Sequence, residues 1–163
     1  STALLADSAD NMGDVLTYAI SVAVVGGALR QRARAAAVKG WIQVGFGSAI
    51  LLEAGRKLLF GLEPIASIMV IAASLALVGN ALCLRLLTRE RGHDINMRSV
   101  WLCSRNDVIG NAAVILTAGL IALTGWVWLD LAVGAGVAVL FIRTGVGVLA
   151  EAKRSLRVDP APS

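Results

Sequence analysis

Five long apolar stretches, separated by short connections, constrain this chain more than any motif does. They run from about residue 8 to 29, 38 to 60, 64 to 87, 99 to 123 and 127 to 152. Each is long enough to cross the ~30 Å hydrocarbon core of a bilayer as an α-helix. Of the 163 residues, 57% are hydrophobic and only 16% are charged, which excludes an ordinary water-soluble domain. The sequence therefore predicts an all-α integral membrane protein, with one transmembrane domain over residues 1–158 and a short tail at 159–163.

The connections at 30–37, 61–63 and 88–98 are short, so consecutive spans are expected to be antiparallel neighbours in one bundle. Arg56 and Lys57 fall on one side of that topology. The other side collects far more basic residues, namely Arg30, Arg32, Arg34, Lys39, Arg85, Arg89, Arg91, Arg98, Lys153, Arg154 and Arg157. The positive-inside rule places this richer side and the C-terminus in the cytoplasm of a multi-pass protein of the cell (inner) membrane. The net charge of +4 then reflects topology and contact with anionic membrane lipid, not nucleic acid.

Two pairs of potential metal ligands interrupt the apolar stretches. Asp10 and Asp14 lie in the first stretch, and Cys103 and Asp107 lie in the fourth. Both pairs are spaced i, i+4, so on a helix each pair shares one face. A charge at bilayer depth costs roughly 2.5–3.5 kcal/mol on insertion scales, which implies a functional reason for these positions. Metal transport is the first hypothesis.

The sequence around both pairs resembles the cation diffusion facilitator family. Residues 3–14 (ALLADSADNMGD) are similar to the family's second transmembrane helix, and residues 96–111 (NMRSVWLCSRNDVIGN) to its ligand-bearing fifth helix. Trp128-Leu129-Asp130 resembles the turn into the sixth. The resemblance covers essentially the whole chain and implies that the five spans are helices 2–6 of a six-helix, usually homodimeric exporter. Such an exporter exchanges cytoplasmic divalent transition metal for protons. Carried over position by position, the resemblance implies a tetrahedral metal site of Asp10, Asp14, Cys103 and Asp107.

The ligand chemistry suggests which metals are transported. The family commonly has His or Asp where this chain has Cys103, and a soft thiolate favours zinc, cadmium or cobalt over manganese and magnesium. Because a divalent metal needs deprotonated ligands, metal and protons compete for the same site, and alternating access converts that competition into antiport. Four nearby polar residues are expected to support the ligands or to line the pathway: Asp7, Thr17, Asn106 and Asn111.

Several alternatives stay open at this point. The chain as a whole is also compatible with a non-transporting membrane partner subunit of the same fold, and Asp7, Asp10 and Asp14 resemble one aspartate-rich motif of magnesium-dependent intramembrane prenyltransferases. Asp107 has a structural alternative, an ion pair with Arg105 or Arg143, and Asp130 is expected to cap a helix.

The start of the chain and the depth of the site also remain open. With the N-terminus outside, a further span or a cleaved signal peptide before Ser1 would fit equally. Depth poses a further question, because Asp107 lies about 13 Å along a helix from Arg98 and Asp14 about 24 Å from Arg30.

Overall fold

The computed structural model describes residues 15–61, 66–92, 94–126 and 128–158, and these residues form helices without a strand. A helical segment over residues 15–23 comes first. It is followed by α2 (Leu29–Phe60), α3 (Ala66–Leu87), α4 (Ile95–Thr124) and α5 (Trp128–Val158). Within the described residues, α2, α4 and α5 are each long and apolar enough to cross a membrane. The predicted all-α membrane bundle is confirmed.

The helices extend beyond the apolar stretches at the end where the arginines gather. Helix α2 begins at Leu29 rather than near residue 38, so the predicted connection at 30–37 is wrong. That segment consists of alanine, arginine and one glutamine, which are strong helix formers, and they continue the helix past the apolar stretch. The turn into α2 falls earlier, around Gly26, whose φ of 74° is a left-handed conformation that glycine adopts at little cost.

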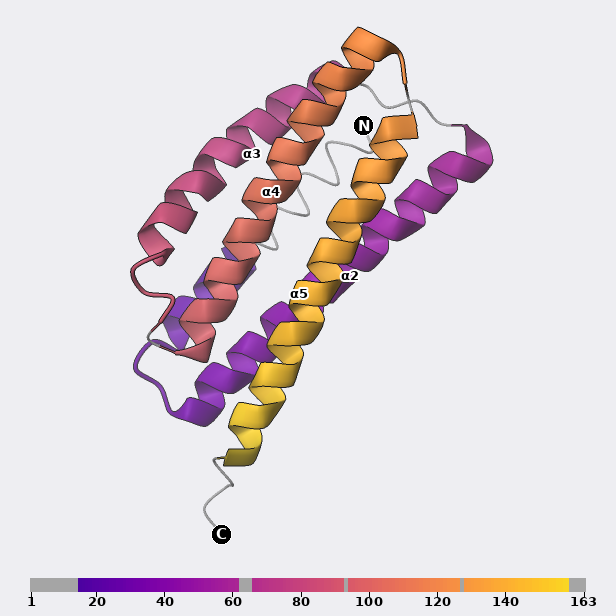
Figure 1. The fold of residues 1–163 in the computed structure, drawn as a ribbon. Helices are drawn as coiled ribbons and strands as arrows, with labels where there is room; N and C mark the ends of the chain where they lie inside the picture. The colour runs from indigo at the N-terminus through magenta and orange to yellow at the C-terminus, as the bar shows by residue number, and fades with distance from the viewer. Residues whose placement is uncertain (1–14, 62–65, 93, 127, 159–163) are drawn as a thin grey trace.

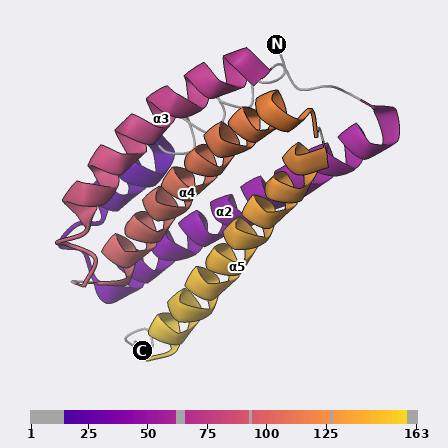
Figure 2. The same ribbon diagram turned by 45° about the horizontal axis from the view of Figure 1, so that its top comes forward.

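The helices form two pairs that meet at α4. Helix α2 lies along α5, α3 lies along α4, and α4 also contacts both α2 and α5 (Figure 1). Figure 2 shows that the start of α2, the end of α3, the start of α4 and the end of α5 share one end of the bundle. We call this the basic end, because it carries Arg30, Arg32, Arg34, Arg85, Arg98, Lys153, Arg154 and Arg157. Arg56 and Lys57 lie near the opposite end of α2.

The bundle is polar inside and apolar outside. Large side chains such as Leu52, Leu75 and Leu123 are 75%, 74% and 85% exposed, as expected for surfaces that face lipid. The buried polar side chains are as numerous as the buried apolar ones among the described residues, and they comprise Thr17, Ser21, Lys39, Gln43, Asn80, Asn96, Ser99, Ser104, Asn106, Asp107 and Thr117. Polar contacts inside the bundle therefore contribute to its specificity, since lipid supplies no hydrogen-bond partners.

Glycines allow α2 and α5 to touch backbone to backbone. A Cβ atom at Gly145 would lie 2.7 Å from the carbonyl oxygen of Gly40 and 2.8 Å from Cγ2 of Val44. At Gly47 a Cβ atom would lie 2.8 Å from the carbonyl oxygen of Ala138. Such distances are too short for any side chain, so this helix pair requires glycine at the contact, as small residues commonly provide in membrane bundles.

We predict that Gly145→Ala lowers the stability of the bundle by about 1–3 kcal/mol, because the added methyl group forces α2 and α5 apart. Gly147→Ala is the matched control, since a Cβ atom there meets nothing within 4 Å. Thermal unfolding of the two variants in detergent is monitored by size-exclusion chromatography, and the two unfolding midpoints are compared. Equal midpoints for the two variants would contradict the close contact.

Candidate functional site

Two of the predicted ligands lie on the inner face of α4. Cys103 and Asp107 are 7% and 6% exposed, and they are one helical turn apart. Asp10, Asp14 and Asp7 lie outside the described residues, so the four-ligand set stays a prediction. Within the described ranges no group of three or more His, Cys, Asp or Glu side chains lies close enough to hold a metal ion. The described structure therefore shows Cys103 and Asp107 buried on one face of α4, and their role as ligands stays a prediction.

The helical segment 15–23 lies directly beside this face of α4. The hydroxyl groups of Tyr18 and Ser104 are hydrogen bonded at 2.8 Å, at the residue that follows Cys103. Thr17, predicted to support the site, is only 3% exposed.

The end of this segment bears on how the depth of the first ligand pair is counted. The helix ends at residue 23, before the turn around Gly26, and Arg30 belongs to α2, so the count from Arg30 does not follow one helix.

A buried lysine connects three helices between Cys103 and the basic end. Lys39 of α2 is fully buried at 0% exposure. The sequence had grouped it with the basic residues on the cytoplasmic side of the membrane. Its ammonium group donates hydrogen bonds to Ser21 Oγ at 2.9 Å, to the carbonyl oxygen of Asn96 at 3.1 Å, and to Asn96 Oδ1. The Asn96 amide in turn donates to the carbonyl oxygen of Ser21 at 3.2 Å. Residues 15–23, α2 and α4 are thus tied together at one point.

The sequence did not indicate this cluster, because Ser21 and Asn96 are neutral and are not spaced like a pair of metal ligands on one helix. The one signal available was Lys39 itself, which lies inside the predicted span 38–60, after the arginines of the predicted connection at 30–37. A charged residue inside a span is a functional hypothesis in its own right.

A second polar contact joins α2 to α4 beside the ligands. Asn106, predicted to support the site, is 0% exposed, and its amide donates to Gln43 Oε1 at 3.3 Å. Arg105 donates to Asn106 Oδ1 at 3.1 Å, and its guanidinium lies over the ring of Trp101. Arg105 therefore has described partners other than Asp107, and Arg143 is exposed. Asn111, the other residue of this predicted group on α4, is partly buried.

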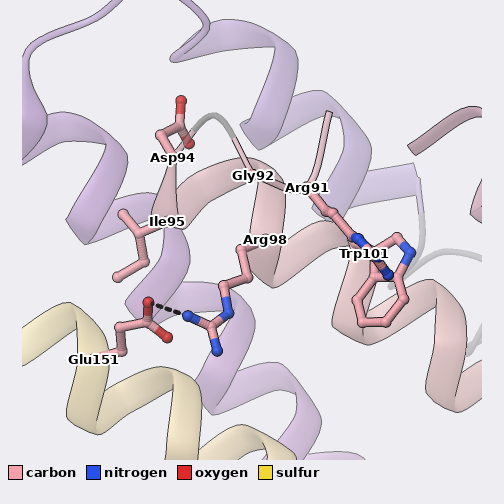
Figure 3. A pocket seen from close by; sticks show the side chains of 7 residues that line it. All are labelled: Arg91, Gly92, Asp94, Ile95, Arg98, Trp101 and Glu151. Carbon is pink, nitrogen blue, oxygen red and sulfur yellow. Dashed lines mark hydrogen bonds and ion pairs between the residues drawn. The ribbon is translucent and has the colours of Figure 1, made fainter. Parts of the chain in front are cut away.

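The basic end carries an open pocket of about 530 Å³ at the start of α4. Figure 3 shows its lining, in which Arg98 of α4 reaches Glu151 of α5 at 2.9 Å. The lining contains two arginines and two carboxylates, so it has no net charge to attract an ion; it comprises Arg91, Gly92, Asp94, Ile95, Arg98, Trp101 and Glu151. Neither Cys103 nor Asp107 borders it, so this pocket is separate from the candidate metal site.

Ion pairs connect neighbouring helices at both ends of the bundle. At the basic end, Arg32 pairs with Asp94 at 3.0 Å, and Asp94 also caps α4 by accepting a hydrogen bond from the backbone N–H of Met97 at 2.9 Å. At the opposite end, Lys57 pairs with Asp130 at 2.7 Å. The prediction that Asp130 caps a helix is wrong, because this residue lies within the first turn of α5 and its carboxylate faces α2 instead.

Known proteins are similar to this chain over most of its length. The family model described as the cation efflux transmembrane domain matches residues 1–157. The chain belongs to the cation diffusion facilitator family. It is similar to the metal cation efflux system protein CzcD of Cupriavidus metallidurans, with 28% identity over 145 residues. A cation efflux system protein CzcD of an Alcaligenes species gives the same identity.

These matches cover 82% of this chain but 46% of each relative, so the chain spans about half the length of the curated relatives it matches. Family membership and the long apolar helices together establish a multi-pass membrane protein.

We predict that Asp94→Ala destabilises the fold by about 1 kcal/mol through loss of the helix cap. Asp94→Asn keeps a good capping residue and is expected to cost less, at about 0.5 kcal/mol for the lost ion pair. Thermal unfolding of both variants in detergent tests the order. If Asp94→Asn costs as much as Asp94→Ala, the cap is not what stabilises α4 here.

The charge of Asp94 also predicts a pH dependence. Burial raises the pKa of this carboxyl, but the hydrogen bonds from Met97 and Arg32 outweigh it and hold the pKa below the ordinary value of 3.8. A lowered pKa means that the stabilisation is present above that value and is lost as the pH falls below it. Unfolding midpoints measured down to about pH 3 are expected to fall less steeply in Asp94→Asn than in the native protein.

Proposed function

We propose that this chain is the transmembrane part of an antiporter that exports divalent transition-metal cations, with zinc, cadmium and cobalt as the preferred class, in exchange for protons. The observation that carries the proposal is the pair Cys103 and Asp107, buried one turn apart on the face of α4 that meets residues 15–23. The names of the relatives, which denote metal cation efflux, support the same direction of transport.

The remaining ligands in this proposal are Asp10 and Asp14. The Tyr18–Ser104 hydrogen bond sets the register between the two segments. Counting back four residues from Tyr18 leads to Asp14, and counting forward three residues from Ser104 leads to Asp107. Because the segments run antiparallel, these steps go in the same direction, so we expect the aspartates to face Cys103 and Asp107. Three carboxylates and one thiolate then surround a single divalent ion.

The donor set explains how protons are exchanged for metal. Without metal, clustered carboxylates in a poorly hydrated interior repel one another and take up protons. An arriving metal cation requires deprotonated oxygen and sulfur ligands and expels those protons. If the site faces the cytoplasm when it binds metal and the outside when it binds protons, the proton gradient drives metal out of the cell.

Orientation and assembly form part of the proposal. We place the basic end, and with it the C-terminus, in the cytoplasm of the inner membrane, because basic residues accumulate on the cytoplasmic side of membrane proteins. The apolar outer surface then contacts lipid, and the working unit is a homodimer, as is usual for the family. Nucleic acid has no part in it.

We predict that Asp107→Asn reduces metal-driven proton release at least about tenfold, since even residues that merely support a ligand cost 10–100-fold when changed. The full-length protein is reconstituted in liposomes with a trapped pH dye, and zinc is added outside. Glu53→Gln is the control, because Glu53 is an exposed acid near the end of α2 opposite the basic end. No flux of any metal through folded native protein would favour the non-transporting partner subunit instead.

A second variant tests what the thiol selects. Cys103→Asp replaces the soft ligand with a hard one, so transport of cadmium is expected to fall relative to manganese by about tenfold. The same liposome assay with the two metals gives the ratio. An unchanged ratio would show that Cys103 does not bind the transported ion.

A further inference from the structure

Lys39 is a buried charge whose described hydrogen-bond partners are all neutral. Its three donor hydrogens are matched by three oxygens, one from Ser21 and two from Asn96. The ammonium group is therefore satisfied as a hydrogen-bond donor, yet no carboxylate among the described residues forms an ion pair with it. An apolar residue at this position would fill the space without burying a charge. A charge kept inside a membrane bundle under these conditions asks for a functional explanation.

The position of the ammonium group relative to Cys103 gives that explanation. Asn96, which receives two of its hydrogen bonds, lies seven residues before Cys103, or two turns and about 10 Å along α4 on the same face. Asp94 lies two residues before Asn96, so the residue that holds Lys39 stands between Asp94 and Cys103 along α4. Asp94 belongs to the basic end and Cys103 to the candidate metal site. Through its contact with Asn96, Lys39 thus lies between the two along α4.

We propose that Lys39 is the gate between the metal site and the basic end of the bundle. Its ammonium group closes this route in two ways. It joins residues 15–23, α2 and α4 through direct hydrogen bonds, and it places a fixed positive charge two turns from Cys103, where that charge opposes the entry of other cations. Opening the route requires these hydrogen bonds to break and the ammonium group to move.

The neutral partners of Lys39 fit a gate better than a permanent structural contact. At the ends of the bundle, the helices are joined by ion pairs between opposite charges, as in Arg32 with Asp94 and Lys57 with Asp130. At Lys39 the acceptors are a hydroxyl, a backbone carbonyl and an amide oxygen, which hold the ammonium group without neutralising it. Its positive charge therefore stays active on the route. This inference rests on the proposed function, in which a metal cation enters from the basic end.

The test uses Cys103 as a reporter of access. In the full-length protein every other cysteine, Cys83 among them, is replaced by serine. Two methanethiosulfonate reagents of similar size, one cationic and one anionic, are applied to the basic-end side of membrane vesicles, and their reaction rates with Cys103 are compared. The variants are Lys39→Gln, which removes the charge, Lys39→Arg, which keeps it, and Lys57→Gln, which removes a lysine from the far end of the same helix.

We expect Lys39→Gln to raise the ratio of cationic to anionic rates by about tenfold, the effect of one charge at this separation in a partly hydrated interior. Lys39→Arg and Lys57→Gln are expected to leave the ratio near that of the native protein. If Lys39→Gln accelerates both reagents equally, Lys39 only holds the helices together, and if neither rate changes, Lys39 is not on the route. Either result overturns the proposal.

The labelling needs no metal, so it separates this inference from the proposed function. A changed ratio in a protein that moves no metal would preserve the gate and reject the exporter. Metal-driven proton release with an unchanged ratio would preserve the exporter and reject the gate.

Discussion

The hydrogen bonds of the Lys39 ammonium group are the contact on which the inner arrangement of this bundle depends. Ser21, Lys39 and Asn96 belong to three different helices, and each is buried. Because lipid offers no hydrogen-bond partners, these groups satisfy one another or remain unsatisfied at considerable cost. The same contact fixes how residues 15–23 lie along α4, and the Tyr18–Ser104 hydrogen bond then sets the register next to Cys103. The position of the candidate metal site follows from this polar interior.

Two kinds of helix contact divide the bundle. The α2–α5 pair meets through Gly40, Gly47 and Gly145 so closely that one methyl group does not fit. Such a contact leaves no room for a larger side chain at these three positions. The contacts between α2 and α4 instead include side-chain hydrogen bonds, such as the one between Gln43 and Asn106, which are both buried. The structure therefore combines a closely packed helix pair with a polar boundary along α4, which carries Cys103 and Asp107.

Charged side chains are accommodated differently at the helix ends and inside the bundle. At the ends of the helices, where water is available, arginines and lysines pair with carboxylates, as in Arg98 with Glu151. The guanidinium group of Arg105 lies over the ring of Trp101 and donates to the Asn106 amide oxygen, so its charge is accommodated by an aromatic face and an amide. Lys39 is handled differently, since its charge is surrounded by neutral oxygens inside the bundle. That difference is why Lys39, and not one of the many arginines, bears on ion movement.

The sequence by itself determined the fold class, the antiparallel helices, the uneven distribution of basic residues and the pair Cys103 and Asp107. Each depends on a property that is local along the chain, such as hydropathy over twenty residues or the spacing of side chains on one helix. The extent of α2 was misjudged, because arginine and alanine form helix outside a membrane as readily as leucine does within it. Only the tertiary structure decided that Lys39 is buried, that Ser21 and Asn96 hold it, and that Asp130 pairs with Lys57. Those contacts join residues 18 to 75 positions apart, and no spacing rule along one helix encodes which distant partners meet.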